Sequence, residues 1–277
     1  MRQHISNHTT NPPAPQRLQK MLAGAGIASR RHIEKMVSEG RITVNSQVVT
    51  EQGLKITPHD RVEIDGKPIP LKTTPFLYII LNKPLRVLST VKDEHGRKTV
   101  RDLLPKDMGR IYPVGRLDYE TSGLLLLTND GNLTLKLTHP RYNIPKTYRL
   151  RLRQALDPKD LKALQQGIKL EDGLTRPAEL RKLHTDTRCR TPQHWVEMTL
   201  KEGRNRQVRR MFEHLGYDIL SLERTAYASL SLKDLSPGAY RTLTPREVAA
   251  LKLEVRCSMS HNKCEPSNRK GPNHVRT

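Results

Sequence analysis

The segment GRLDYETSGLLLLTNDG, residues 115–131, places the carboxylate of Asp118 shortly before a run of four leucines. Apolar surroundings favour the protonated form of a carboxyl group, so an ionised Asp118 requires a cationic partner. An ionised carboxylate that is held in place can act as a nucleophile or as a base. An aspartate after Arg-Leu is more often a turn residue, and spacing alone leaves that structural interpretation open. We expect the leucine run to be a core strand that forms the floor of a dry pocket beside the carboxylate.

A basic segment further along the chain could supply the partner of Asp118. In KEGRNRQVRRMF, residues 201–212, five basic residues stand against the single acid Glu202. Helical spacing turns the apolar residues of this segment toward a core and leaves Arg209 at the edge of that face. A partly buried arginine needs an anion, so we predict an ion pair between Arg209 and Asp118. The alternative is that all five cations bind phosphates at the surface. We expect that phosphate-binding role for Arg204, Arg206 and Arg210.

A second group of cations lies near the N-terminus. Its members are Arg17, Lys20, Arg30, Arg31, Lys35 and Arg41. Ser29 is a good N-cap, which places Arg30 and Arg31 at a helix N-terminus, where the helix dipole disfavours cations. An anionic ligand at this helix end would remove the conflict, because the backbone N–H groups and the arginines would both face it. The alternative is a solvated basic face without a ligand.

Composition narrows the class of protein. The 277 residues include 49 Lys and Arg against 28 Asp and Glu, a formal net charge of +21. Such an excess indicates a polyanionic partner, either nucleic acid or an acidic membrane surface. No stretch approaches the roughly 18 apolar residues of a transmembrane helix. The first 33 residues lack a secretory apolar core, and because they are also acid-poor an organelle transit peptide remains an alternative to a cytoplasmic protein.

Cysteine usage favours a reducing compartment, because there are only three cysteines and the number is odd. Cys257, His261 and Cys264 lie close enough in sequence to suggest a metal site. Their spacing matches no standard zinc pattern, so we expect no metal site.

The elements that must position these residues fall into two predicted domains. Residues 1–16 are rich in proline and predict a disordered arm. Residues 17–66 predict two helices, a hairpin at Asn45-Ser46 and a further strand. Residues 67–75 contain three prolines and predict a linker. Residues 76–255 predict the larger domain, and residues 256–277 a disordered basic tail.

Strands outnumber helices in the larger domain. Strands are predicted in FLYIIL, RIYPV, KTYRLRLR and HWVEMTL, and KTYRLRLR alternates to give a half-buried strand with one basic face. Helices are predicted after Asp157, within NRQVRRMFEHLG, and after Thr244, where Thr244 and Glu247 occupy the positions of a capping box. We therefore expect an α+β fold with a mixed, largely antiparallel sheet.

The smaller domain resembles a known RNA-binding module. RLQKMLAGAGIASRRHIEKMVSEGRITVNSQVV is similar to the alpha-L-type RNA-binding domain named after a small-subunit ribosomal protein. The resemblance implies recognition of structured RNA through shape and phosphate contacts. The residues expected to contact RNA are Arg17, Arg30, Arg31, Lys35 and Arg41.

The larger domain resembles the pseudouridine synthases. GRLDYETSGLLLLTNDG is similar to their catalytic motif, LNKPLRVLST to their opening strand and loop, and EGRNRQVRRMF to their third motif. The resemblance covers about Arg17 to Lys252 and is closest to the RsuA/RluB/RluE/RluF branch. The family often has glycine two residues after the proline of the opening loop, where this chain has Arg86, which puts the shape of that loop in question.

The resemblance implies a role for each matching residue. Asp118 corresponds to the catalytic aspartate, Tyr148 to the tyrosine that stacks on the target base, and Arg209 to the basic residue that pairs with the aspartate. Leu222 corresponds to the apolar residue that closes the pocket, and Arg116 is expected to line it. Whether the aspartate attacks the ribose, attacks the base or removes a sugar proton stays open.

The resemblance also implies a reaction and a substrate. The family breaks the bond between the uracil nitrogen and the ribose, rotates the base and rejoins it through carbon five, with neither cofactor nor metal. The arginine at position 209 resembles the residue found there in the large-subunit enzymes of the branch, so we expect the substrate to be a uridine of 23S ribosomal RNA. We also expect a monomeric protein that does not bind a membrane. The alternatives are a non-catalytic ribosomal RNA-binding or ribosome-assembly factor, and a metal-dependent nuclease or phosphatase.

Overall fold

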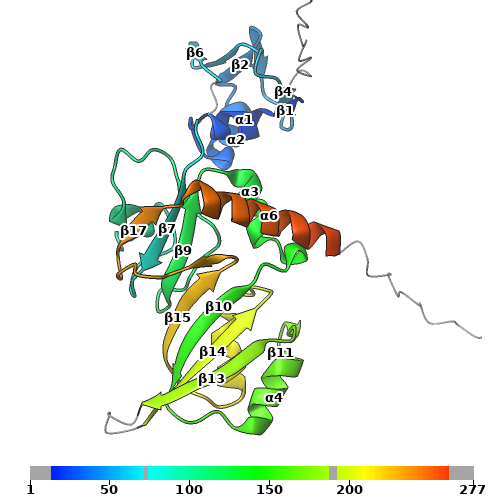
Figure 1. Cartoon of the computed structure of the whole chain (residues 1–277). Coiled ribbons are helices and arrows are strands. Elements are labelled where there is room, and N and C mark those ends of the chain that lie inside the picture. The colour runs from blue at the N-terminus through cyan, green and yellow to red at the C-terminus, as the bar shows by residue number, and fades with distance from the viewer. Residues whose placement is uncertain (1–13, 72–73, 187–191, 262–277) are drawn as a thin grey trace, which may run out of the picture. The chain divides into compact units, whose positions relative to one another are not determined.

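The structure, a computed structural model, describes residues 14–71, 74–186 and 192–261. The chain divides into two compact units, Met1–Phe76 and Leu77–Thr277 (Figure 1). Residues 1–13 of the predicted arm, residues 262–277 of the predicted tail, and both Cys189 and Cys264 lie outside the described residues. No helix among the described residues has the length and apolarity needed to cross a membrane.

The first unit packs two helices against a four-stranded antiparallel sheet of order β3-β2-β5-β6. Its elements are β1 (Gln16–Arg17), α1 (Leu18–Gly24), α2 (Arg30–Ser38), β2 (Ile42–Val44), β3 (Gln47–Val49), β4 (Lys55–Ile56), β5 (Val62–Ile64) and β6 (Lys67–Ile69). The Ser29 side chain accepts a hydrogen bond from the His32 N–H at 3.1 Å, which confirms the predicted N-cap of α2. Asn45 and Ser46 both have positive φ, which confirms the predicted hairpin.

The predicted start of the linker is wrong, because residues 67–69 form strand β6. Asp65 and Gly66 both have positive φ and turn the chain back, so that Ile69 pairs with Val62. Strand β6 lies at the edge of the sheet, where Pro68 can be accommodated without the N–H that an inner strand would need.

The second unit is built on a nine-stranded sheet with the path β13-β14-β10-β15-β9-β7-β17, to which β16 and β8 are attached. Its strands are β7 (Tyr78–Lys83), β8 (Tyr112–Pro113), β9 (Ser122–Thr128), β10 (Lys146–Leu152), β13 (Glu179–Asp186), β14 (Gln193–Leu200), β15 (Ile219–Tyr227), β16 (Leu230–Ser231) and β17 (Tyr240–Thr242). All pairings in this sheet are antiparallel except that of β15 with β9. The mixed, largely antiparallel sheet of the prediction is confirmed.

Helices and short strands complete this unit. They are η1 (Val100–Leu103), α3 (Gly131–Thr138), η2 (Pro140–Tyr142), α4 (Pro158–Gln166), β11 (Lys169–Leu170), β12 (Gly173–Leu174), α5 (Gln207–His214) and α6 (Pro245–His261). Asp157 caps α4, accepting from the Lys159 N–H at 2.7 Å, and Thr244 and Glu247 form the predicted capping box of α6. Figure 1 shows α3 and α6 beside β7 and β9, and α4 beside β13.

Helix α6 runs to His261, so the predicted boundary at residue 256 places the start of the disordered tail too early. Leu251 and Val255 are buried in the core beneath this helix. Neither proline nor glycine follows Val255 within the helix, and nothing in the backbone chemistry stops it there.

The leucine run forms most of β9 and is buried on both faces of the sheet. Leu124 and Leu126 pack in the core that includes α3 and α6. Leu125 and Leu127 point the other way and pack with Leu117 and Val87. The run is therefore a core strand, as predicted, and all four leucine side chains pack within the two cores.

Gly123 allows the parallel contact between β9 and β15 that brings the Asp118 loop to the middle of the sheet. Its φ is +108°, and a Cβ at this position would lie 2.3 Å from the Arg224 carbonyl oxygen. Any side chain here would push the two strands apart, so glycine is required by close backbone approach.

Candidate active site

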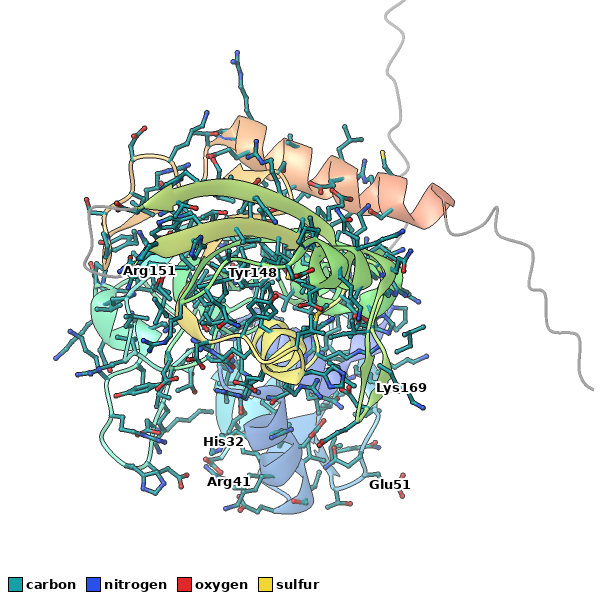
Figure 2. All side chains as sticks on the ribbon, turned by 90° about the horizontal axis from the view of Figure 1, so that it is seen from below. His32, Arg41, Glu51, Tyr148, Arg151 and Lys169 are labelled. Carbon is teal, nitrogen blue, oxygen red and sulfur yellow. The ribbon has the colours of Figure 1, made fainter. Side chains whose placement is uncertain are left out.

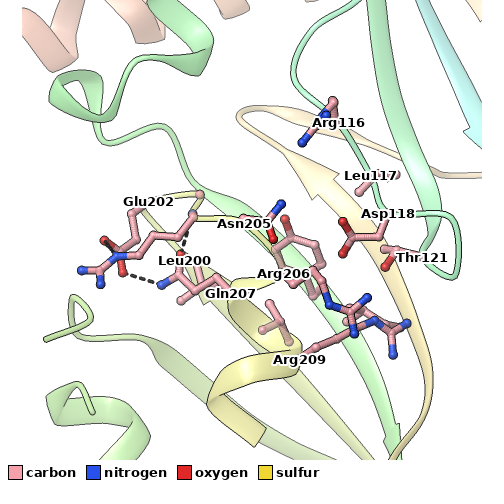
Figure 3. Close-up of a pocket in the computed structure, with 15 residues that line it drawn as sticks. Arg116, Leu117, Asp118, Thr121, Leu200, Glu202, Asn205, Arg206, Gln207 and Arg209 are labelled. Atoms are coloured by element: carbon pink, nitrogen blue, oxygen red, sulfur yellow. Dashed lines mark hydrogen bonds and ion pairs between the residues drawn. The ribbon is translucent and has the colours of Figure 1, made fainter. Parts of the chain in front are cut away.

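A cavity of about 220 Å³ opens between the loop that carries Asp118 and the N-terminal end of α5 (Figure 3). Its lining residues are Arg116, Leu117, Asp118, Thr121, Tyr148, Leu200, Glu202, Gly203, Arg204, Asn205, Arg206, Gln207, Val208, Arg209 and Leu222. The structure thus brings together residues of two separate motifs, residues 115–131 and 202–212, with Tyr148 and Leu222 from elsewhere in the chain. None of the leucines of β9 lines the cavity, which corrects the predicted floor. The apolar part of the cavity lining consists instead of Leu117, Leu200, Val208 and Leu222.

The loop before β9 is fixed by hydrogen bonds on both sides of Asp118. The Ser89 hydroxyl donates to the Leu117 carbonyl at 2.7 Å and accepts from the Leu117 N–H at 3.0 Å. The Arg86 N–H donates to the Tyr119 carbonyl at 2.8 Å, and the Thr121 N–H donates to the Asp118 carbonyl at 3.0 Å. Asp118 itself is half-buried, so a rigid turn presents its carboxylate to the cavity.

Arg86 keeps the backbone shape for which glycine is suited. Its φ is +59°, in the left-handed region that a residue with a Cβ seldom adopts. Its side chain is exposed, and its N–H makes the bond to Tyr119. The opening loop therefore supports the Asp118 turn despite the substitution.

The predicted ion pair between Arg209 and Asp118 is wrong for this structure, because no such pair forms within the described residues. The Arg209 Nη2 instead donates to the Glu120 carbonyl at 2.7 Å. The Arg209 Nε is buried without a hydrogen-bond partner. Arg209 lies at the edge of α5 as predicted, and from there it reaches the backbone of the turn and not its carboxylate.

Lys83 interacts electrostatically with Asp118, a role that was not predicted from the sequence. The Lys83 side chain is fully buried at the end of β7, and its Nζ donates to the carbonyls of Val87 at 2.8 Å and Pro84 at 3.0 Å. Burial lowers the pKa of Lys83 to about 8, and the negative charge of Asp118 opposes that shift. A lysine that ends the otherwise apolar run YIILNK was the signal that could have revealed it.

Tyr148 and Leu222 come from adjacent strands behind the carboxylate. Tyr148 is half-buried and packs against both cores that meet at the cavity. Leu222 of β15 is buried and pairs with Leu150 of β10. The alternation of β10 turns Tyr148 to the cavity and Arg149 to the solvent, so the predicted basic face of this strand is confirmed.

Internal hydrogen bonds hold the segment 202–210. Glu202 is buried and accepts from the Arg176 N–H at 3.0 Å, from the Arg204 Nε at 3.4 Å and from the Gln207 amide. The Arg204 guanidinium also donates to Asp172 and to the carbonyls of Gly173 and Leu174.

Arg210 is bonded in a similar way. Its guanidinium donates to the Asp172 carboxylate at 2.8 Å and to the Asn205 carbonyl at 2.9 Å. Hydrogen bonds from Arg210 and Arg204 hold the pKa of Asp172 below its usual value. Arg204 and Arg210 both donate to Asp172 and brace the segment, and their binding of phosphate stays a prediction.

Two cations at the cavity remain available to an anionic ligand. Arg116 is exposed and forms no hydrogen bond or ion pair with any described residue. Arg206, at the N-cap of α5, makes one long ion pair of 3.7 Å with Glu213 and keeps its side chain 44% exposed.

The cations of the first unit also divide into those with free side chains and those bonded within the protein. Arg17, Arg30 and Arg31 are exposed, and their side chains have no hydrogen-bond or ion-pair partner among the described residues. Lys35 makes only an exposed ion pair of 3.7 Å with Glu39. Arg41, labelled in Figure 2, forms two hydrogen bonds to Asp65 at 2.6 and 2.8 Å, and its contact with RNA stays a prediction.

Comparison with known proteins bears on both units. Residues 77–214 match the family model described as RNA pseudouridylate synthase, and residues 16–62 match the S4 domain. The chain is 47% identical over 238 residues to the ribosomal large subunit pseudouridine synthase B of Bacillus subtilis (strain 168), covering 86% of this chain and 96% of that protein. It is 43% identical over 237 residues to an uncharacterized RNA pseudouridine synthase of Aquifex aeolicus (strain VF5), covering 85% and 93%.

A solved structure is also similar. The crystal structure of a pseudouridylate synthase superposes with a TM-score of 0.62 at 28% identity, covering 85% of this chain and 99% of that chain. A first unit of S4 type and a second unit with a carboxylate-bearing cavity accord with these matches. The chain belongs to the RNA pseudouridylate synthase family.

Proposed function

We propose that this enzyme converts a uridine of large-subunit ribosomal RNA to pseudouridine in the cavity beside Asp118. The observation that carries the proposal is the convergence of the Asp118 carboxylate, the Tyr148 ring and an apolar wall that includes Leu222 on a single small cavity. Its volume of about 220 Å³ is below the roughly 300–1,000 Å³ of pockets that enclose drug-sized ligands. Such a cavity suits one nucleotide that has left its stack, as the reaction requires.

Each residue has a proposed role in that reaction. The Asp118 carboxylate acts on the nucleotide as a nucleophile or as a base, and either role requires its ionised form. Tyr148 stacks on the flipped base, and Leu222 covers its far side. Lys83, when charged, attracts the carboxylate from its buried position. The reaction rearranges one nucleotide, so atoms balance without a second substrate.

Exposed cations are proposed to hold the rest of the RNA. Arg116 and Arg206 lie at the cavity, where phosphates on either side of the target nucleotide would pass. On the S4 domain we assign this role to Arg17, Arg30 and Arg31, and a weaker one to Lys35. At α2 the unpaired backbone N–H groups of the helix N-terminus add to the attraction for phosphate.

The large subunit is preferred because the similar protein of B. subtilis carries that name and is matched over 96% of its length. The test is to incubate the purified protein with unmodified transcripts of both ribosomal RNAs and to map pseudouridine by carbodiimide-dependent primer extension. We expect a stop in the large-subunit transcript that is absent with Asp118→Asn. A stop confined to the small-subunit transcript would overturn the proposed substrate, and RNA binding without any product would favour a non-catalytic assembly factor.

We also propose that the enzyme acts as a monomer in the cytoplasm. All residues of the cavity come from one chain, so no second copy is needed to complete it. Light scattering coupled to gel filtration, with and without RNA, measures the oligomeric state, and a stable dimer would contradict the first part of the proposal.

A further inference from the structure

Thr121 carries a buried hydroxyl group that has no hydrogen-bond partner. The residue is 2% exposed, and its Oγ1 is one of four buried side-chain atoms among the described residues that lack any partner. A buried hydroxyl without a partner destabilises the folded protein. Valine has almost the same shape and would avoid that cost. The presence of a hydroxyl here therefore suggests that it gains a hydrogen-bond partner only when substrate is bound.

The position of this hydroxyl relates it to Asp118. The Thr121 N–H donates to the Asp118 carbonyl at 3.0 Å, so residues 118–121 form a turn with these two residues at its ends. The ends of such a turn lie within about 7 Å of each other. Both residues line the cavity, and Figure 3 shows their side chains next to each other on the same wall.

A second unpaired donor lies at the same turn. The Arg209 Nη2 is bonded to the carbonyl of Glu120, the residue before Thr121, while the Arg209 Nε is buried without a partner. Two buried donors at this turn, the Thr121 hydroxyl and the Arg209 Nε, thus lack a partner. An anion is what such donors would accommodate, and Asp118 is the carboxylate of this turn that lines the cavity.

We propose that Thr121 is a positioning residue whose hydroxyl donates to the Asp118 carboxylate once a nucleotide fills the cavity. This inference rests on the proposed function. Asp118 is half-buried and lines the cavity, which is open to solvent in the free enzyme. An incoming base displaces the solvent, and the carboxylate then needs a donor from the protein to stay ionised. Rotation of the Thr121 side chain within the turn supplies it without movement of the backbone.

The test compares Thr121→Val, which removes the hydroxyl at nearly constant shape, with Thr121→Ser, which keeps it. We expect Thr121→Val to have an unchanged or higher Tm and an RNA affinity within about twofold of the original. Its kcat should fall at least about tenfold, and the acidic limb of the profile of kcat against pH should move to higher pH, because the ionised carboxylate has lost a donor. Thr121→Ser should restore kcat to within about threefold and restore the limb.

Thr128→Val is the matched control at the other end of β9. The Thr128 hydroxyl is buried but satisfied: it donates to the Leu77 carbonyl at 2.5 Å and accepts from the Asp130 N–H at 3.0 Å. Removing it should lower Tm by several degrees and leave kcat of the folded protein within about twofold. The two valine variants are therefore expected to behave in opposite ways.

Several outcomes would overturn the inference. An unchanged kcat and acidic limb in Thr121→Val would do so, and so would a fall in Tm that matches Thr128→Val and accounts for the lost activity. A weaker RNA affinity or higher KM with the same kcat would mean that the hydroxyl contacts the nucleotide and not Asp118. If the unsubstituted enzyme forms no pseudouridine in either transcript, the proposed function fails and the inference with it. If the unsubstituted enzyme forms pseudouridine and Thr121→Val has the same kcat, the inference is refuted while the proposed function stands.

Discussion

At the scale of single residues, two ionisable groups of opposite charge, Asp118 at the cavity and the buried Lys83, interact electrostatically. Asp118 lies on a turn that is hydrogen-bonded on both sides, while Lys83 is buried behind it and holds two loop carbonyls. Arg209, the partner expected from the motif, holds the turn through the Glu120 carbonyl. The carboxylate is thus positioned through its backbone and influenced through space by a buried cation.

The first prediction concerns Asp118→Asn. The amide keeps the size of the side chain but removes its charge, its basicity and its nucleophilic oxygen. The variant should fold with an unchanged Tm, bind RNA with unchanged affinity and form no pseudouridine in a primer-extension assay. Normal turnover by this variant would remove Asp118 from the catalytic role.

The second prediction concerns Lys83 and pH. Its pKa of about 8 in the folded protein lies below its ordinary value of 10.5. Between these values the unfolded chain binds more protons than the folded one, so the contribution of Lys83 to stability rises with pH across this window. Its attraction for Asp118 is present below about pH 8 and is lost above it.

Activity should accordingly decline as the pH rises through about 8. In Lys83→Met, which fills similar volume without a charge, kcat should be lower at pH 7 and this alkaline decline should be absent. The pH profile of kcat for both proteins, with Tm measured at each pH, checks the prediction. An alkaline decline that persists unchanged in Lys83→Met would assign it to another group.

At the scale of elements, the segment that leads into α5 is a braced loop. Four of its polar side chains are bonded within the protein, those of Glu202, Arg204, Gln207 and Arg210. The bracing links this segment to the hairpin of β11 and β12 through Asp172. The cavity wall is therefore rigid, and Arg206 is left to face solvent.

The third prediction separates two arginines of this segment. Arg204→Ala removes one of the three donors to Glu202 and the side-chain donor to the carbonyls of Gly173 and Leu174, and should cost about 1–3 kcal/mol of stability. Arg206→Ala should leave Tm unchanged, weaken RNA binding and lower the slope of log affinity against log salt by about one. Thermal unfolding and filter binding over a range of salt concentrations measure both effects. The same salt-sensitive binding defect in the two variants, with Tm intact, would contradict the assignment.

At the scale of the whole molecule, the chain has two units with separate cores. The core of the first unit consists only of residues between Leu18 and Leu71, and those of the second only of residues from Leu77 onward. All residues of the cavity belong to the second unit. The proposed chemistry therefore belongs to the second unit alone, while the proposed contacts with RNA are divided between both units.

The fourth prediction is that deletion of residues 1–76 leaves a folded catalytic unit. Its cores lose no apolar partner, so cooperative thermal unfolding should be retained. RNA affinity should fall and its salt slope should become shallower, because Arg17, Arg30 and Arg31 are lost. Calorimetry and binding titrations check the two parts. Aggregation of the truncated protein would show that the units share stabilising contacts.

The sequence by itself determined those features whose interactions lie within a few residues. The cap at Ser29, the hairpin at Asn45-Ser46 and the capping box at Thr244 follow from local backbone chemistry. The alternation of β10 correctly turned Tyr148 and Arg149 to opposite faces. The motif around Asp118 was enough to indicate the family and the cavity residue.

Tertiary structure alone decided which partners the long charged side chains choose. Arg204 bonds to Asp172, 32 residues away, and Arg209 to Glu120, 89 residues away. The sheet brings these groups together, and a flexible arginine bonds to whichever acceptor lies within reach, whether a carboxylate or a carbonyl. The same holds for Lys83, whose burial depends on the loops that cover the end of β7. Charge and spacing identify such residues as candidates for binding RNA. Only the packing of the elements determines whether their side chains bond within the protein or stay exposed to a ligand.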